Sequence, residues 1–171
     1  VIKYDMHGNI LAQWGERGSF PNETRPGHWN NVHGIAVDPT TRRVFVNDRN
    51  NGRVQVFDED GNYLDEWSFF TGRRGQPMDI HSFIVTSDQK LWAADQGTHK
   101  ILGYDLDGHF LYSWGSWGEY PGGMWGVHGM STDKEGNFYT ASVNNGRIQK
   151  FRPREGTNPE FLVGKPWPRV W

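Results

Sequence analysis

The chain has no cysteine, its apolar runs are short, and its charge is nearly balanced. The absence of cysteine excludes a disulfide framework and thiolate chemistry, although it leaves the cellular compartment open. No apolar run approaches the roughly 20 residues that a membrane-spanning helix needs, which argues against a membrane partner. The formal net charge is −2 over 171 residues, so the chain lacks the basic footprint expected of a nucleic-acid-binding protein.

Helical periodicity is also lacking, and this excludes a helical solenoid. Aromatic residues are abundant instead, at 15% of the chain with nine Trp, and there are 22 Gly. Regularly spaced glycines and aromatics are typical of all-β proteins with tight turns. The composition therefore predicts an all-β fold with enough residues for one ordinary core.

A repeat of about 47 residues runs through the chain. His33, His81 and His128 are 48 and 47 residues apart, and Asp48, Asp95 and Ser142 follow at intervals of 47. A fixed period of this length indicates a repeat architecture. A β-sandwich would have alternating strands but not this self-similarity.

Each repeat contains short stretches with period-2 alternation, separated by turn residues, and these predict four antiparallel strands. Four short strands per repeat form one blade of a β-propeller. We expect a partial blade at 1–14, a polar loop at 15–31, complete blades at 32–67, 80–114 and 127–163, and an extended tail at 164–171. In the last blade, Phe161–Val163 is expected to supply the fourth strand.

Three blades and a partial one are too few to close a ring, since propellers typically have 4–8 blades. An open ring would expose sheet edges and an apolar face. We therefore expect the ring to be completed by further chain, by a second copy or by a partner. Val1–Tyr4 reads as the middle of a strand, so we expect the sequence to be the C-terminal piece of a longer protein.

The turn between the second and third strands carries a family signature. It reads Asp-Arg-Asn-Asn-Gly-Arg-Val-Gln at 48–55, followed by Phe-Asp-Glu-Asp-Gly at 57–61, and Asn-Asn-Gly-Arg-Ile-Gln recurs at 144–149. These motifs resemble NHL repeats up to about residue 151. Within that group, His33 with Arg49 sixteen residues later, and Gln-Trp-Gly-Glu at 13–16, resemble the lyase domain of peptidylglycine α-amidating enzymes.

That resemblance implies a six-bladed propeller that cleaves a peptidyl-α-hydroxyglycine, or a related α-hydroxy amide, into an amide and glyoxylate. It implies zinc held by three His from alternate blades, with His33 as the second ligand and His128 as the third. It also implies Arg49 as a catalytic residue, and places the first His and a catalytic Tyr before Val1. The family has an Asp after the third His, linked to calcium; Gly129 stands there, which speaks against calcium. The resemblance favours a secreted or periplasmic protein.

The residues support part of this chemistry without the resemblance. The first strand of every propeller blade lines the central channel, so His33, His81 and His128 are expected at one channel mouth, where three His can hold zinc with an open position. Arg49 can bind a substrate carboxylate with two hydrogen bonds. Each His could instead be structural, above all His81, which lies outside the family pattern, and Arg49 could pair with Asp38 or Asp48.

The remaining candidate residues are expected to be structural or to have one of two possible roles. Asp48 and Asp95 are expected to cap turns, and Arg53 and Arg147 are expected to be structural. His28 could reach the site. Aromatic residues of the loops that precede each blade could bind a peptide side chain or pack on the propeller; they are Trp29, Trp117, Tyr120 and Trp125.

Four functions remain open from the sequence: a zinc-dependent lyase, a non-catalytic scaffold that binds a protein or peptide, an RNA-binding propeller and a lactonase-like hydrolase. A lactonase would need a carboxylate-rich axis, whereas this axis is rich in His. RNA binding would need a basic face, whereas the loops of that face are mixed, with Glu16, Glu23 and Glu119 beside Arg17, Arg25, Arg73 and Arg74.

Overall fold

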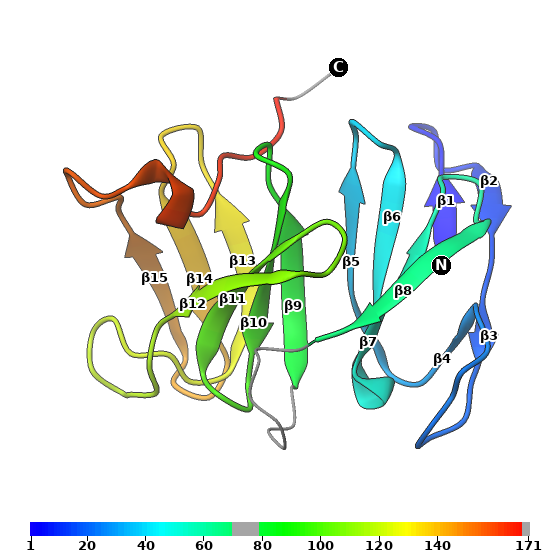
Figure 1. Cartoon of the computed structure of the whole chain (residues 1–171), viewed down its shortest axis with the longest axis horizontal. Helices are drawn as coiled ribbons and strands as arrows, with labels where there is room; N and C mark the ends of the chain where they lie inside the picture. The colour runs from blue at the N-terminus through cyan, green and yellow to red at the C-terminus, as the bar shows by residue number, and fades with distance from the viewer. Residues whose placement is uncertain (70–78, 169–171) are drawn as a thin grey trace. The chain divides into compact units, whose positions relative to one another are not determined.

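The computed structural model describes residues 1–69 and 79–168, so Arg73, Arg74 and the end of the tail lie outside the described residues. The chain forms two compact units, Val1–Ser68 and Phe69–Trp171. Both are built mainly from small antiparallel sheets, and the fold class is all-β, as predicted (Figure 1). Within the described ranges, no helix has the length and apolar character needed to cross a membrane.

The first unit contains a two-stranded hairpin and a four-stranded sheet. The hairpin pairs β1 (Ile2–Tyr4) with β2 (Ile10–Gln13). The sheet has the order β5-β6-β7-β8, with β5 at Val32–Asp38, β6 at Arg43–Asp48, β7 at Arg53–Phe57 and β8 at Tyr63–Ser68. A short 3-10 helix, η1 (Arg49–Asn51), follows β6. The simple order of neighbouring strands is the blade topology that the repeat predicts.

The long loop of the first unit is more ordered than the sequence suggests. Where a polar loop was expected, β3 (Glu16–Arg17) and β4 (His28–Trp29) form a parallel pair. Trp29 is buried and packs with Val44, Val46 and Phe57. The apolar side chain of Trp29 therefore anchors the end of this loop to the sheet.

The hairpin turns share one pattern of hydrogen bonds around an Asp side chain. Asp58 accepts hydrogen bonds from the backbone N–H groups of Asp60 and Asn62 through Oδ1, and from the side-chain amide of Asn62 through Oδ2. The Asn62 amide holds the pKa of Asp58 below its usual range. Gly61 has a φ of +90°, which a residue with a Cβ rarely adopts. Asp5 and Asp105 make the corresponding bonds in their own turns, so the sequence spacing determines these turns locally.

The second unit contains a four-stranded and a three-stranded sheet. The first has the order β12-β11-β10-β9, with β9 at Ile80–Val85, β10 at Lys90–Asp95, β11 at Lys100–Asp105 and β12 at Phe110–Trp114. The second has the order β13-β14-β15, with β13 at Val127–Thr132, β14 at Phe138–Ser142 and β15 at Arg147–Phe151. Buried Trp92, Ile101, Met124 and Phe138 form the core of this unit.

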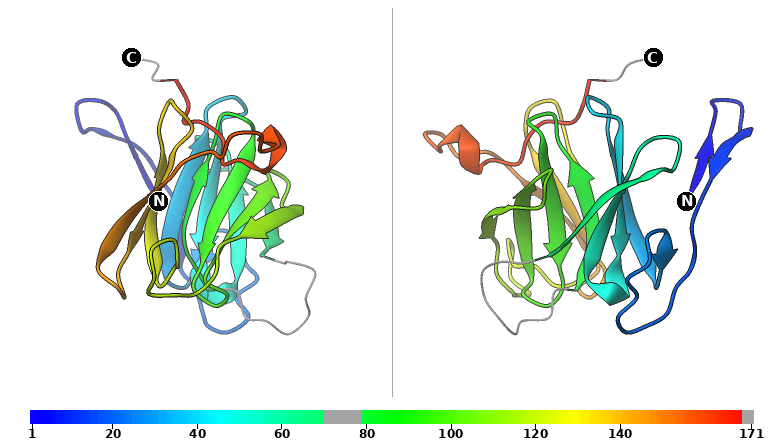
Figure 2. Two further views of the ribbon diagram at one scale, coloured as in Figure 1. Left: turned by 90° about the vertical axis from the view of Figure 1, so that its left-hand side faces the viewer. Right: turned by 45° about the vertical axis from the view of Figure 1, so that its right-hand side comes forward.

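The prediction of a fourth strand at Phe161–Val163 is wrong. Pro159–Phe161 form a 3-10 helix, η2, and the sheet of β13–β15 has no fourth strand among the described residues. The segment crosses to the neighbouring sheet instead: Lys90 Nζ donates to the carbonyl of Glu160 at 3.0 Å, and Ser87 N–H donates to the carbonyl of Lys165 at 2.9 Å. Figure 2 shows η2 leading away from the end of β15. In the part of the chain that the structure describes, the outer edge of β15 therefore has no strand partner.

Candidate functional site

The three repeat histidines occupy the same structural position, a β-bulge near the start of the first strand of each sheet. His81 is the extra residue of β9, since Ile80 pairs with Asp95 and Ser82 with Ala94. In β13 and β5 the register shifts at the corresponding places, between Val127 and Gly129 and between Val32 and Ile35. A bulge turns a side chain out of the regular alternation, and bulges recur beside functional sites.

His81 and His128 are in direct contact within the second unit. Their Nδ1 atoms are 3.2 Å apart, and the ring centroids are 4.1 Å apart with the planes at 71°. His81 is buried, with 7% of its surface exposed, whereas His128 is exposed. The resemblance to amidating lyases implies no metal ligand in the blade of His81. In the structure, however, His81 is in direct contact with His128.

Asp79 orients His81 from outside the pair. Its Oδ2 lies 3.2 Å from Nε2 of His81, so this nitrogen donates its proton to the carboxylate. The Nδ1 of His81 then carries a lone pair directed at His128, whose own Nδ1 also lies 3.2 Å from the carbonyl oxygen of Gly126. Sequence reasoning missed Asp79, although a carboxylate two residues before a candidate ligand is a usable signal.

This donor set fits a zinc ion. Two nitrogens bound tetrahedrally at roughly 2.0–2.1 Å lie about 3.3 Å apart, close to the separation of the two Nδ1 atoms. A carboxylate on the second ring nitrogen is the usual support of a metal-binding His. The pair supplies two imidazole ligands, which leaves room in the coordination sphere for a third protein ligand and for substrate.

His33 and Arg49 lie in the first unit. His33 is exposed in the bulge of β5, the place that His81 and His128 hold in their own strands. Arg49 opens η1 directly after β6 and is half-buried. The metal-binding role of His33 and the catalytic role of Arg49 stay predictions.

Asp48 is a structural residue, as predicted, and it shapes the loop that presents Arg49. Its carboxylate is fully buried and accepts hydrogen bonds from the backbone N–H of Asn30 at 2.8 Å, from Asn51 Nδ2 at 3.0 Å and from Arg53 Nε at 2.8 Å. Arg53 donates further to Glu66 and to the carbonyl of His28. Buried charges persist in proteins when they are paired and hydrogen-bonded in this way.

The loop aromatics divide between packing and exposure. Trp29 packs in the core of the first unit, with 5% of its surface exposed. Trp117 and Tyr120 are more than half exposed, and Trp117 meets Trp125 edge-on at 6.3 Å. His28 makes a local contact, since its Nδ1 lies 3.0 Å from the carbonyl oxygen of Pro26. The loop before β13 thus presents two exposed aromatic side chains in the second unit.

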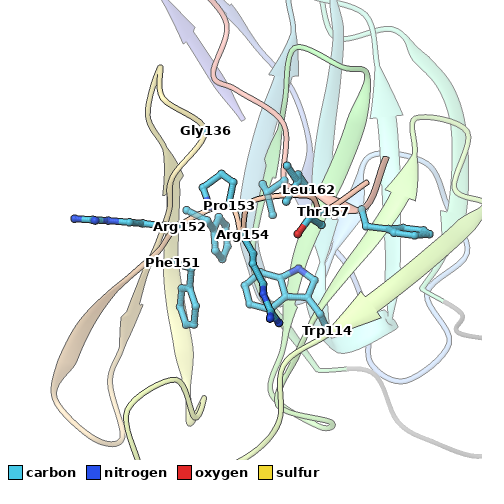
Figure 3. A pocket seen from close by; sticks show the side chains of 11 residues that line it. Trp114, Gly136, Phe151, Arg152, Pro153, Arg154, Thr157 and Leu162 are labelled. Carbon is cyan, nitrogen blue, oxygen red and sulfur yellow. The ribbon is translucent and has the colours of Figure 1, made fainter. Parts of the chain in front are cut away.

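A cavity of about 250 Å³ lies beside the three-stranded sheet. Trp114 and Phe151 form its aromatic wall, and Pro153, Arg154 and Leu162 come from the segment after β15 (Figure 3). Trp114 and Phe151 meet edge-on with ring centroids 5.3 Å apart. This cavity could not be predicted from the sequence, because its lining includes Phe161, Leu162 and Val163, which were expected to form a strand.

Comparison with known proteins identifies the fold family. Residues 31–116, half of the chain, match the family described as 6-bladed beta-propeller. The chain belongs to the 6-bladed β-propeller family. This membership confirms the predicted architecture and the resemblance to propellers of the NHL group.

Two curated relatives agree with the resemblance. The chain is 35% identical over 60 residues to peptidylglycine alpha-amidating monooxygenase of Rattus norvegicus, covering 35% of this chain and 6% of the relative. It is 39% identical over 69 residues to NHL repeat-containing protein 3 of Homo sapiens, covering 40% of this chain and 18% of the relative. The chain therefore spans less than a fifth of the length of either protein.

Solved structures of propellers show the same fold. The structure of a luciferin-regenerating enzyme matches with a TM-score of 0.58 and 15% identity, covering 82% of this chain and 50% of that one. A streptogramin B lyase matches with a TM-score of 0.52 and 18% identity, covering 73% and 42%. At such identities the likeness concerns the fold alone.

Proposed function

We propose that this propeller is a zinc-dependent lyase that cleaves a peptidyl-α-hydroxyglycine, or a related α-hydroxy amide, into an amide and glyoxylate. The observation that carries the proposal is the His81–His128 pair, with its Nδ1 atoms 3.2 Å apart and Asp79 behind it. The partial match to peptidylglycine alpha-amidating monooxygenases supports the choice of reaction.

We assign the zinc ligands to His81 and His128, and add His33 as a third on the strength of its place in the repeat. Asp79 fixes the ring of His81 so that Nδ1 keeps its lone pair for the metal. The bulges of β5, β9 and β13 turn the three imidazoles out of the sheet alternation. When bound, zinc supplies Lewis acidity toward a substrate hydroxyl or carbonyl oxygen.

Arg49 is assigned to the substrate carboxylate. The substrate ends in –NH–CH(OH)–COO⁻, and its carbon–nitrogen bond breaks as the hydroxyl proton leaves and the amide nitrogen gains a proton, with no change of oxidation state. A guanidinium can bind the carboxylate with two parallel hydrogen bonds and so fix the α-carbon. The Asp48 network holds the turn from which Arg49 projects.

The zinc assignment is tested by metal content and affinity. We expect the native chain to bind zinc, His128→Ala to lose it, and Asp79→Asn to weaken zinc affinity about 10–100-fold while the fold persists. His109→Ala is the matched control, because His109 is exposed in a surface turn where its Nδ1 lies 2.8 Å from Asp105. Unchanged zinc affinity in both His128→Ala and Asp79→Asn would refute the assignment.

The reaction is tested separately, with a short peptide ending in α-hydroxyglycine and glyoxylate as the measured product. Arg49→Lys keeps the positive charge but cannot form a bidentate pair of hydrogen bonds with a carboxylate. We therefore expect it to raise KM while the zinc content stays native. If the zinc-loaded native protein forms no glyoxylate, the lyase proposal fails even though the metal site stands.

A second candidate function rests on the exposed aromatic loop before β13. Trp117 and Tyr120 expose 56% and 55% of their surfaces, and the Tyr120 hydroxyl is bonded to Ser116 Oγ at 2.7 Å. Exposed aromatic side chains are common anchors for a bound peptide or protein. A scaffold of this kind would bind its ligand without zinc, and Trp117→Ala would abolish that binding while His128→Ala would not.

A further inference from the structure

The cavity beside the three-stranded sheet lies outside the candidate metal site. Its volume is about 250 Å³. Two of its lining residues, Phe138 and Phe151, pair with each other at one end of the sheet, whereas Val127 and Ser142 pair at the other end, next to His128. The cavity is therefore separate from the histidine pair, and the proposed lyase chemistry leaves it without a role.

The inner wall of the cavity is aromatic and firmly packed. The ring of Trp114, from the end of β12, lies 5.4 Å from that of Phe138 and 5.3 Å from that of Phe151, with the planes at 73° and 72°. Edge-on contacts of this kind are a favoured arrangement of aromatic rings. Phe138 is 3% exposed and belongs to the core of the unit, against which Trp114 and Phe151 also pack. The wall is thus preformed and offers ring surface to a flat apolar group.

The outer wall is the segment that follows β15, and this segment is attached to the neighbouring sheet. Val163 is buried in the core of the unit. On either side of it, the carbonyl of Glu160 accepts a hydrogen bond from Lys90 Nζ, and the carbonyl of Lys165 accepts one from the backbone of Ser87. The cavity is therefore bounded by fixed structure on both sides, as a small-molecule site requires.

The charges around the cavity are positive. Two of the lining residues, Arg152 and Arg154, are cationic, and none is a carboxylate; Glu155 and Glu160 belong to the same segment but do not line the cavity. Figure 3 shows Arg154 extending toward Trp114, whereas Arg152 points away from the other labelled side chains. A guanidinium at the rim of an apolar space favours a ligand with a negatively charged, planar group such as a carboxylate.

The volume sets the size of the ligand. A cavity of about 150 Å³ lined by apolar side chains holds benzene, and the further ~100 Å³ present here equals roughly three water volumes. That is room for a short linker and a carboxylate beyond a single ring. We propose that the cavity binds a small aromatic carboxylate of the arylpropanoate type, with its ring on Trp114 and Phe151 and its carboxylate on Arg154 and the hydroxyl of Thr157 (Figure 3).

Isothermal titration calorimetry of the full chain with 3-phenylpropanoate tests the proposal at physiological ionic strength. We expect one site per chain with a Kd between about 10 μM and 1 mM, the range that a ligand of roughly 11 non-hydrogen atoms can reach. The alcohol 3-phenylpropanol has the same ring without the charge, so it should bind about 10-fold more weakly. Propanoate has the charge without the ring, so it should give no measurable binding.

Three variants locate the ligand. Arg154→Met removes the charge but keeps a long side chain, so it should weaken 3-phenylpropanoate about 10-fold and leave 3-phenylpropanol unchanged. Arg152→Met is the matched control, because the Arg152 side chain points away from the cavity, and it should change neither affinity more than about twofold. Leu162→Trp fills the cavity and should abolish the binding of both compounds. Both Arg side chains are exposed, so the two Met variants should keep the fold, which circular dichroism checks.

Three results would overturn the proposal. No saturable binding of 3-phenylpropanoate at millimolar concentrations would mean that water alone fills the cavity. Binding that Arg154→Met and Leu162→Trp both leave intact would place the ligand elsewhere. An equal loss in Arg152→Met and Arg154→Met would show a general effect of positive charge and no direct contact with the carboxylate.

Discussion

The sheet of β5–β8 and the sheet of β13–β15 belong to the same sequence repeat, but they differ in their number of strands and in one buried polar residue. In the first, Asp48, Arg53 and Gln55 form one closed network under a complete four-stranded sheet. In the second, Ser142 replaces the carboxylate and the fourth strand is absent among the described residues. The repeat thus conserves the frame of a blade, while single substitutions decide whether its buried polar groups are satisfied.

The largest expected effect breaks the network of the first sheet. Asp48→Ser reproduces the substitution found at Ser142 and leaves Arg53, which is 4% exposed, with Glu66 as its remaining carboxylate. Removing one partner of a buried ion pair is strongly destabilising, so we expect a loss of about 3 kcal/mol in the free energy of unfolding. Urea denaturation measures it.

Ser142→Ala is the counterpart of that change. It removes a hydroxyl that has no hydrogen-bond partner among the described residues, so we expect an effect close to zero or slightly stabilising. If Asp48→Ser were as mild as Ser142→Ala, the two positions would be energetically equivalent and the comparison between the sheets would be wrong.

A smaller difference is expected between Gln55 and Gln149, each of which forms hydrogen bonds to the backbone of the loop that precedes its sheet. Gln55 is fully buried, whereas Gln149 is half-buried. Gln55→Leu should therefore cost about 1–3 kcal/mol in the free energy of unfolding, since the backbone groups of Gly27 and His28 lose their partner away from water. Gln149→Leu should cost less, because water can replace its bonds. Equal costs in denaturation experiments would contradict the difference in burial.

The smallest effect depends on pH and concerns the loop of the first unit. Glu23 accepts hydrogen bonds from the side chain of Arg25 and from Ser19, and the Arg25 guanidinium holds the pKa of Glu23 well below its usual range. A lowered folded-state pKa gives stability that is present above the ordinary Glu pKa of 4.5 and is lost as the pH falls below it. The stability advantage over Glu23→Gln should therefore shrink between neutral pH and pH ~3.

Arg25→Met is the matched variant for this measurement. It removes the main cause of the lowered pKa, so the unfolding free energy of this variant should depend less on pH over the same range. A native protein and a Glu23→Gln variant with parallel pH profiles would show that the Glu23–Arg25 bonds do not stabilise the folded loop.

Much of the fold was predictable because it is determined locally. The Asp58–Gly61 turn needs a short acceptor and a residue with positive φ, and both are visible in the sequence. The β3–β4 pair was missed because a two-residue parallel pairing has no periodic signal and depends on Trp29 reaching a core formed by later strands. The prediction of a strand at Phe161–Val163 was wrong because a short apolar run does not reveal that this segment crosses to Ser87 and Lys90.

Residue order alone is enough to predict the blade repeat, the turns and the repeat position of His33, His81 and His128, because period and turn chemistry are local properties. The folded chain adds three facts: these histidines lie in bulges, His81 contacts His128, and Asp79 supports His81. Bulges, cross-strand register and unpaired buried groups arise when distant segments pair. They are therefore visible only once the strands have been brought together.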